Sequence, residues 1–541
     1  MFGPSVRQAM RNRSIRRAEL AWLIGIAAQW AYLVAILVYT YDIGGVVAAG
    51  LASTLRMLPA AFLAPIVTGV ADRLPPGRVL LGVHAGRAAA VGLAAVVVIT
   101  GLPPALVFVA IVLEGVIACL HRPTTLALMP ALARSPQELV ATNAVTSTGE
   151  ALGTLVGPAL GGVLLAIGGP GLAIASTGVA FGLAALAVMA IDAQRPVATA
   201  GAARVGRLEQ MLAGFAALRT YPAAGALVAL FSVQTFVRGI LTVLLVAVSV
   251  ELLLLGEAGV GYLNSAIGAG GLIGAFLTLA LVARRRLALP YSVSLAMWGL
   301  PIVGIGLLPE PAIAFALLAV LGLANATLDV SGLSLVQRSV PNAVRARVFG
   351  AFEGIVTLTF GLGSLVAPLL VELLDVRGAL VLAGSLLPVL ALVSAGIVRR
   401  ADDSAVVPHD RLELLRSVPM FEPLPMTMLE LIAGGLVEER HAAGVDVIRQ
   451  GDPGDCWYLV VEGQVAVARD DRLVAELGRG DGFGEIALLS ERPRTATVRA
   501  TQPLYVYRLP RSVFLEAITG NPNAVIAGEE LAASRLAELG L

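Results

Sequence analysis

The sequence contains no lysine, so its 38 basic residues are all arginine. A chain without lysine has no P-loop lysine and no residue that forms Schiff bases, which excludes ATP-driven transport by a Walker site and pyridoxal chemistry. Charged residues make up only 14% of the 541 residues, whereas 57% are hydrophobic. This composition predicts a protein that crosses a membrane many times.

Cysteine and histidine are also scarce. The two cysteines, Cys119 and Cys456, lie far apart, and the four histidines have no ligand-like spacing. We therefore expect neither a disulfide nor a metal site. Because no nucleophile–base arrangement is recognisable, we also expect no enzymatic activity and no catalytic residue.

Long apolar runs fill the first 400 residues. A helix needs about 20 apolar residues to cross a bilayer, and we find twelve such stretches, at 19–41, 46–70, 78–100, 104–124, 138–166, 170–191, 223–250, 258–282, 287–308, 311–334, 347–371 and 378–398. Arginines occur in every second connecting segment and at both ends of this region, with Arg377 as the exception. By the positive-inside rule, both termini then lie in the cytosol. Because exclusive use of arginine is typical of GC-rich bacteria, we expect a bacterial cytoplasmic (inner) membrane.

The composition divides the chain into five parts. We expect a six-helix bundle at 1–191, a cytosolic connecting segment at 192–222, a second six-helix bundle at 223–400, a polar linker at 401–411 and a soluble α+β domain at 412–541. Five apolar residues of the connecting segment share one helical face: Leu208, Met211, Leu212, Phe215 and Leu218. They predict an amphipathic helix on the inner membrane surface, with a solvated linker helix as the alternative.

The stretch 138–166 is rich in small residues that recur at intervals of four. Its motif consists of Gly153, Gly157, Pro158, Gly161 and Gly162. Small residues at this spacing let helices approach closely, so generic helix packing is one reading. The string also resembles the antiporter motif of major facilitator superfamily exporters.

The segment after 46–70 carries a second motif, "GVADRLPPGR". It resembles the cytosolic gate motif of the same superfamily, with matching residues Gly69, Asp72, Arg73, Gly77 and Arg78. Two extra residues separate its two halves, so the match is incomplete. The resemblance covers roughly residues 15–400. It implies a mainly α protein of twelve transmembrane helices, in which two six-helix bundles enclose a cavity that opens alternately to either side.

Ionisable residues inside membrane spans are costly to bury and are usually functional or paired. We assign five to transport and proton coupling: Arg56, Arg87, Glu114, Glu150 and Arg238. Two more, Asp329 and Glu353, lie nearer the cytosolic ends and are assigned to the gate. Glu114 and Glu150 are the candidate proton carriers. The alternative is a structural carboxylate paired permanently with Arg56 or Arg87.

The stretch "FGEIALLSERPRTATV" resembles the phosphate-binding cassette of cyclic-nucleotide-binding domains, whose fold is an α+β β-roll. The resemblance covers about 412–541 and implies a ligand site at Phe483, Gly484, Glu485, Ile486, Ala487, Leu488, Pro493, Arg494, Thr495 and Ala496. It implies that Glu485 holds the ribose, while Arg494, Ala487 and the Gly484 backbone hold the cyclic phosphate. The alternative is a degenerate domain that keeps the fold and binds nothing.

The sequence does not decide which cyclic nucleotide binds or which residue caps its base. We expect cAMP as a regulatory ligand, with cGMP as the alternative because Thr495 follows the cassette arginine. The C-terminal helix from about Pro522 is expected to close over the base, with Arg535 or Leu536 as the cap.

These features predict a secondary active transporter that exports a small amphipathic organic molecule by proton coupling and is regulated allosterically by cyclic nucleotide. Its expected partners are the lipid bilayer, the nucleotide, the cargo and the proton, with no nucleic acid, and we expect a monomer. Two alternatives stay open: a receptor that responds to cyclic nucleotide without transporting, and a lipid or glycolipid flippase on the same fold.

Overall fold

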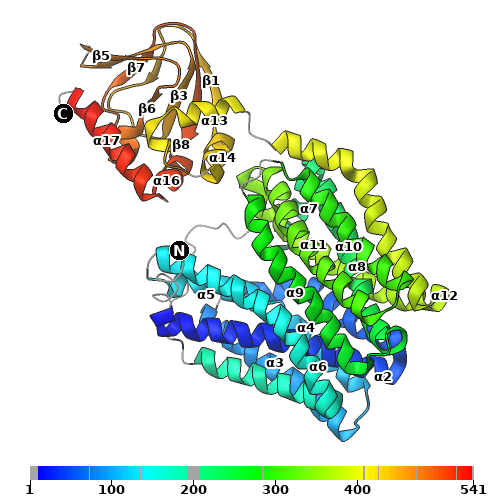
Figure 1. The fold of residues 1–541 in the computed structure, drawn as a ribbon. Helices are drawn as coiled ribbons and strands as arrows, with labels where there is room; N and C mark the ends of the chain where they lie inside the picture. The colour runs from blue at the N-terminus through cyan, green and yellow to red at the C-terminus, as the bar shows by residue number, and fades with distance from the viewer. Residues whose placement is uncertain are drawn as a thin grey trace. The chain divides into compact units, whose positions relative to one another are not determined.

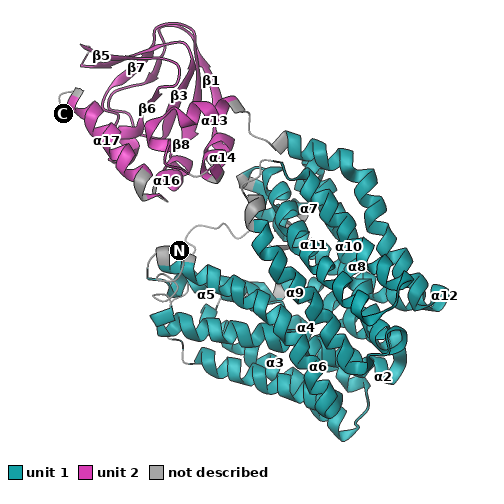
Figure 2. Cartoon of the chain, in the orientation of Figure 1, with its two compact units in different colours: residues 1–405 teal, residues 406–541 magenta. Residues whose placement is uncertain are grey.

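The computed structural model describes residues 10–71, 74–134, 136–189, 191, 207–282, 286–405, 409–424, 426–470, 472–490, 492–519 and 521–538. The chain forms two compact units, residues 1–405 and 406–541, which we call unit 1 and unit 2 (Figure 2). Asp72 and Arg73 of the predicted gate motif lie outside the described residues.

Unit 1 is helical throughout its described part (Figure 1). Its elements are α2 (Arg13–Ala71), α3 (Pro76–Thr100), α4 (Ala105–Ala118), α5 (His121–Leu132), α6 (Pro136–Met189), α7 (Arg207–Thr220), α8 (Pro222–Ala247), the π-helix η1 (Val248–Leu252), α9 (Gly256–Val282), α10 (Ala288–Leu307), α11 (Pro311–Arg338) and α12 (Asn342–Ala405). Within the described residues, nine helical stretches are long and apolar enough to cross a membrane.

Three of the long helices contain a break. The breaks lie at Gly44–Gly45 in α2, Gly168–Gly169 in α6 and Asp375 in α12. Each break lies between two stretches that are predicted above to be separate spans. Gly45 and Gly169 have positive φ angles of 58° and 66°, a conformation that glycine adopts without steric cost. Dividing these three helices turns the nine stretches into twelve segments. The number of membrane crossings stays a prediction.

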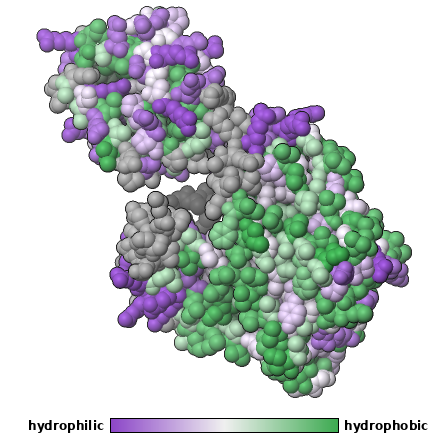
Figure 3. Space-filling model, viewed as in Figure 1, coloured by the Kyte–Doolittle hydropathy of each residue, from purple (hydrophilic) through white to green (hydrophobic). Residues whose placement is uncertain are grey.

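Large apolar side chains are exposed along the outside of unit 1. Phe62, Phe276 and Leu392 are 69%, 69% and 80% exposed, and Figure 3 shows a broad apolar surface over the helices, whereas polar residues cover much of unit 2. An apolar surface of this extent is stable in lipid and not in water. Unit 1 is therefore the multi-pass membrane part of the protein.

The glycine motif of α6 lies where this helix touches two others. Three of its glycines face α2: Gly153, Gly157 and Gly161. A Cβ added to Gly157 would lie 2.6 Å from Ala27 O. Gly162 instead faces α9, where a Cβ would lie 2.7 Å from Ala258 O. The motif thus permits backbone contact both within the first bundle and across to the second.

Helix α12 extends beyond the predicted end of the second bundle at residue 400. It ends at Ala405, and α13 (His409–Arg416) follows. The predicted linker at 401–411 is therefore helical at both ends. The cause is visible in the sequence, because "ADDSA" contains no helix breaker and the first one is Pro408.

Unit 2 combines a β-roll with flanking helices (Figure 1). Its strands are β1 (Val437–His441), β2 (Asp446–Ile448), β3 (Cys456–Glu462), β4 (Val465–Arg469), β5 (Arg472–Leu477), β6 (Gly482–Phe483), β7 (Thr497–Ala500) and β8 (Leu504–Pro510). They form two antiparallel sheets of order β1-β8-β3-β6 and β2-β7-β4-β5. The other elements are α13, η2 (Pro419–Phe421), α14 (Met426–Gly435), α15 (Glu485–Leu489), α16 (Arg511–Thr519) and α17 (Pro522–Glu538).

The helices of unit 2 pack on one sheet through an aromatic cluster. Trp457 of β3 is fully buried, with its ring centroid 5.0 Å from that of Phe421 and 6.1 Å from that of Phe514. Three aromatic side chains from η2, β3 and α16 therefore fix the helices to the roll. This contact holds the sheet that carries β6 and, directly after it, α15.

Candidate functional sites

Unit 2 contains a cavity of about 80 Å³ between its two sheets, α15 and α17. It is lined by Ile448, Val467, Val474, Ala475, Leu477, Phe483, Gly484, Glu485, Ile486, Ala487, Arg494, Thr495, Ala496, Val498 and Arg535. Eight of the ten predicted ligand-site residues are among them. The other two are Leu488, which is buried in the core of the helical face, and Pro493, which is exposed.

The short helix α15 begins at a backbone position that requires glycine. Gly484 precedes the helix with φ of 95° and ψ of 1°, in the left-handed region. A Cβ there would also lie 2.6 Å from Arg494 Nη1. Glycine thus serves both the turn from β6 into α15 and the close approach of the arginine.

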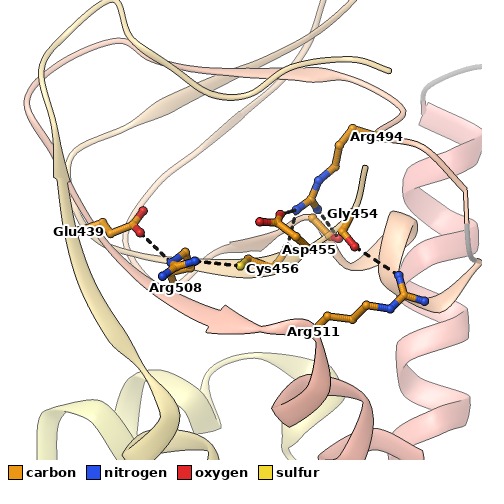
Figure 4. A network of polar contacts seen from close by, with 8 residues as sticks. Glu439, Gly454, Asp455, Cys456, Arg494, Arg508 and Arg511 are labelled. Carbon is orange, nitrogen blue, oxygen red and sulfur yellow. Dashed lines mark hydrogen bonds and ion pairs between the residues drawn. The ribbon is translucent and has the colours of Figure 1, made fainter. Parts of the chain in front are cut away.

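Arg494 contacts this turn, and its side chain, drawn in Figure 4, is only 4% exposed. Its Nη1 donates to Gly484 O at 2.9 Å, and its Nη2 donates to Cys456 O at 2.7 Å. Nη2 also contacts Asp455 Oδ1 at 3.1 Å, but that carboxylate is 71% exposed. Main-chain carbonyls satisfy hydrogen bonds without carrying a full negative charge. The positive charge of Arg494 is therefore only partly compensated.

The loop from Gly451 to Asp455 holds the arginine backbone in place. Gly451 N donates to Arg494 O at 2.9 Å, and Arg494 N donates to Asp452 O at 2.8 Å. Arg511 Nη1 fixes the loop from its other side by donating to Gly454 O at 3.2 Å (Figure 4). The loop before β3 therefore fixes the backbone from which the Arg494 side chain extends.

Next to this loop, Cys456 contacts a second arginine. Arg508 Nη1 lies 3.3 Å from Cys456 Sγ, and Arg508 Nε lies 2.7 Å from Glu439 Oε1 (Figure 4). Burial raises the pKa of the Cys456 thiol, so the sulfur is a neutral thiol at neutral pH. Neither Cys456 nor Arg508 is among the residues that line the cavity.

Glu485, at the start of α15, is 1% exposed. Its Oε1 accepts a hydrogen bond from Arg535 Nη1 of α17 at 2.8 Å, and the same nitrogen donates to Gly482 O at 2.6 Å. The second carboxylate oxygen, Oε2, is buried and has no hydrogen-bond partner among the described residues. A ligand hydroxyl that donates to Oε2 would satisfy it. Of the two predicted base-capping residues, the cavity lining includes Arg535 and not Leu536.

Unit 1 contains a cavity of about 600 Å³ between its two halves. Four of the predicted transport and gate residues line it: Arg56, Glu150, Arg238 and Asp329. Its walls also include Trp30, Trp298, Phe360, Gln29, Asn264 and Asn325. The lining is thus largely apolar and aromatic, with a few polar groups from each half.

Glu114 lies behind this cavity wall in a triad with two arginines. Its Oε2 accepts from Arg56 Nε at 2.8 Å, and its Oε1 accepts from Arg87 Nη2 at 2.7 Å. Glu114 and Arg87 are fully buried, and Phe181 covers the Arg87 guanidinium at 4.1 Å. These contacts match the alternative given above, in which Glu114 is a structural carboxylate paired with Arg56 or Arg87. Here it is paired with both arginines.

The carboxylates that do reach the cavity are held more loosely. Glu150 Oε1 contacts Arg122 Nη1 at 3.2 Å, with the two side chains 37% and 67% exposed. Asp329 Oδ2 accepts from Asn325 Nδ2 at 2.9 Å, and Asn325 Oδ1 accepts from Trp298 Nε1 at 3.0 Å. Glu353 is exposed and is not part of the cavity lining.

Hydrogen bonds between the two halves lie toward the end of unit 1 where α2 is broken. Ser53 Oγ and Ser364 Oγ are 2.8 Å apart, and Thr54 Oγ1 donates to Gly361 O at 3.2 Å. A further contact joins the Tyr41 hydroxyl to Glu251. The halves are therefore in direct contact on this side of the cavity.

A family model described as "Major Facilitator Superfamily" matches residues 20–352, which is more than half of the chain. The chain belongs to the major facilitator superfamily. A second family model, described as "Cyclic nucleotide-binding domain", matches residues 438–521. The predicted fusion of a transporter domain with a C-terminal cyclic nucleotide-binding domain is confirmed.

Similar proteins include regulators and channels. The type II regulatory subunit of cAMP-dependent protein kinase from Drosophila melanogaster is 41% identical over 93 residues, which cover 16% of this chain and 25% of that protein. A cyclic nucleotide-gated potassium channel from Mesorhizobium japonicum is 37% identical over 110 residues, which cover 20% and 30%. The solved regulatory domain of Toxoplasma gondii PKA with cAMP aligns with 25% identity, a TM-score of 0.23, and coverage of 26% of this chain and 56% of that one.

Three residues of the superfamily's gate motif lie in the described part of the chain. Gly69 is near the end of α2, and Gly77 and Arg78 are in the first turn of α3, with Arg78 exposed. They flank the turn between the two helices, so the motif is placed at a helix–helix connection, as in the pattern it resembles. Its gating role stays a prediction.

Proposed function

We propose that this superfamily transporter exports a small amphipathic organic molecule by proton antiport across a bacterial inner membrane, with both termini in the cytosol, and that cAMP in unit 2 regulates it. One observation carries the regulatory part. A single cavity brings together a buried arginine whose charge is only partly compensated and a buried glutamate, one of whose oxygens has no hydrogen-bond partner in the described part of the chain.

The chemistry of these two groups fits a cyclic nucleotide. Arg494 offers a fixed positive charge for the cyclic phosphate, with the backbone around Gly484 and Ala487 beside it. Glu485 Oε2 offers an acceptor for the ribose 2′-hydroxyl. Both residues line the same cavity, so one ligand that enters it can contact both. Thr495 also lines the cavity and leaves cGMP as the alternative ligand.

The transport part rests on the lining of the cavity in unit 1. Trp30, Trp298 and Phe360 provide apolar surface, while Asn264 and Asn325 provide hydrogen-bonding groups. Such a mixed lining suits a cargo with an apolar body and polar edges. The contacts between the halves on one side of the cavity support alternating access, in which these contacts open as others close.

We assign proton exchange first to Glu150 and Asp329, which line the cavity, and keep Glu114 as a further candidate. A group that exchanges protons during transport needs access to water. Glu150 and Asp329 meet this condition in the cavity, whereas both oxygens of Glu114 bond to buried arginines. Arg238 lines the same cavity and supplies a positive charge there, whereas Arg56 is already paired with Glu114.

The energy available from the nucleotide limits the size of its effect. A ligand at a hundred times its dissociation constant supplies about 2.7 kcal/mol. A change from 1:99 to 99:1 in a conformational equilibrium requires about 5.5 kcal/mol. We therefore expect cAMP to change the transport rate by a moderate factor and not to switch transport fully on or off.

Two measurements on the purified full chain test the proposal. In calorimetry, cAMP should bind to the wild type and not to Arg494→Ala. If neither cAMP nor cGMP binds to the wild type, unit 2 is only a scaffold. In proteoliposomes with a pH gradient and a panel of amphipathic fluorescent dyes, flux should fall in Glu150→Gln and Asp329→Asn. If the protein moves a fluorescent lipid and not the dyes, it is a flippase. If it moves neither, the receptor alternative is favoured.

A further inference from the structure

The helix that leads toward unit 2 makes a specific contact just before it ends. Asp402 lies in the last turn of α12 and is 2% exposed. Its Oδ2 accepts hydrogen bonds from two backbone amides at the start of α10, Leu287 N at 2.8 Å and Ala288 N at 2.9 Å. The last residues of unit 1 are thereby joined to a helix more than a hundred positions earlier in the chain.

The chemistry of this contact makes it directional and strong. The first amides of a helix have no partner within the helix and attract a carboxylate, which also interacts favourably with the helix dipole. The α10 N-cap residue, Leu287, provides no side-chain cap of its own, so Asp402 takes that place from another helix. The neighbouring Asp403 points elsewhere: it is 53% exposed and lies 4.0 Å from the exposed Arg286 Nη2.

Helix α10 connects this end of the molecule to the transport cavity. It carries Trp298, whose Nε1 donates to Asn325 Oδ1, and Asn325 in turn donates to Asp329. Helices α10 and α12 also touch along their length, since a Cβ on Gly299 would lie 2.3 Å from Gly384 O. A movement of the end of α12 therefore has a continuous packed and hydrogen-bonded route to a cavity carboxylate.

We propose that Asp402 is the positioning residue through which nucleotide binding in unit 2 acts on the transport cavity: the end of α12 holds the first turn of α10, and the chain continues from that end into unit 2. This inference rests on the proposed function, since it specifies how its regulation is transmitted. A merely structural cap would stabilise α10 equally with and without nucleotide.

Hydrogen exchange at the two capped amides tests the inference directly. The full chain is compared with and without saturating cAMP, and the segment that contains Leu287 and Ala288 is followed. In the wild type, cAMP should change the exchange rate of these amides about fivefold or more, as expected for the strengthening or loosening of charge-assisted hydrogen bonds. In Asp402→Asn the two amides should exchange about tenfold faster than in the wild type, and cAMP should no longer change their rate.

Matched variants separate the possible outcomes. Asp403→Asn, one residue away and exposed, should behave as the wild type, and Asp402→Glu should retain the response to cAMP. Should Asp402→Asn fail to fold, Arg494→Ala still tests the route, because this change in unit 2 must abolish the response at Leu287 and Ala288. Wild-type protein that binds cAMP in calorimetry but shows unchanged exchange at these amides would overturn the inference, whereas absence of cAMP binding would overturn the proposed function itself.

Discussion

Each unit of this protein buries an arginine, and the two arginines are compensated in different ways. Arg87 of unit 1 is fully buried and donates to Glu114, a carboxylate that is itself fully buried. Arg494 of unit 2 is 4% exposed and donates mainly to main-chain carbonyls, and the carboxylate closest to it, Asp455, is 71% exposed.

The difference separates a structural charge from one that is available to a ligand. In unit 1 the protein itself supplies the buried counter-charge, so removal of Glu114 leaves two arginines uncompensated in a medium of low dielectric constant. In unit 2 the counter-charge is solvated, and an anion that enters the cavity finds a positive charge already held in place. We expect the first arrangement to govern stability and the second to govern binding.

The largest effect is expected on stability in unit 1. Glu114→Gln leaves Arg56 and Arg87 without a counter-charge and should destabilise the protein by about 3–5 kcal/mol. Thermal unfolding in detergent measures this loss. Glu150→Gln is the matched control, because its partner Arg122 is exposed and such pairs contribute about 0–1 kcal/mol. Equal unfolding temperatures for the two variants would show that the triad is not a structural element.

The next effect is expected on binding in unit 2. Arg494→Ala removes the charge that we assign to the cyclic phosphate, and the affinity for cAMP should fall by about 100-fold, as for the loss of one or two charge-assisted hydrogen bonds. Isothermal titration of the full chain measures it. Arg492→Ala, which changes an exposed arginine two residues earlier, should leave the affinity unchanged. A similar loss in both variants would mean that general electrostatic attraction, and not the buried position, binds the nucleotide.

A smaller effect should distinguish the ribose contact from the contact with Arg535. Glu485→Gln should lower the affinity for cAMP by about tenfold, because a charge-assisted hydrogen bond becomes a neutral one. The affinity for 2′-deoxy-cAMP, which lacks the hydroxyl, should stay as in the wild type. If the affinities for cAMP and 2′-deoxy-cAMP fall equally, Glu485 acts through its contact with Arg535 on α17 and not through the ribose.

The smallest effect belongs to an ion pair at the surface of the roll. The hydrogen bond from Arg499 Nε, 2.5 Å long, holds the pKa of the Asp446 carboxyl below its usual value. A carboxyl with a lowered folded-state pKa stabilises the fold above its unfolded pKa of about 4 and loses this contribution as the pH falls through the lowered value. Asp446→Asn should therefore be slightly less stable than the wild type at pH 7, and the difference should shrink as the pH falls below about 4. A difference that does not change between these pH values would contradict the assigned pKa.

The meeting of most candidate nucleotide-site residues around one cavity could be predicted from the sequence because most of them are close together in the chain. Gly484, Glu485 and Arg494 lie within one turn–helix–loop segment whose backbone is set by glycine and by the contacts of the preceding loop. The cap was not decided, because Arg535 comes from α17 and its approach to Glu485 depends on how that helix packs. Sequence spacing carries no information about such a contact.

The contacts in unit 1 were less predictable for the same physical reason. The sequence showed that Glu114, Arg56 and Arg87 need partners, but which of them meet depends on the rotation of three helices about their axes. Asp402 was missed altogether, because "ADDSA" has the composition of a linker. The absence of a breaker before Pro408 was the signal that α12 continues, and nothing local indicated that an acid there would cap α10.

The most direct test of the account is a density map of the full chain with saturating cAMP. The cyclic phosphate should lie within hydrogen-bonding distance of the Arg494 guanidinium, and the ribose 2′-hydroxyl should donate to Glu485 Oε2. A map in which the ligand lies elsewhere, or in which side chains of the protein fill the space between these two residues, would contradict it.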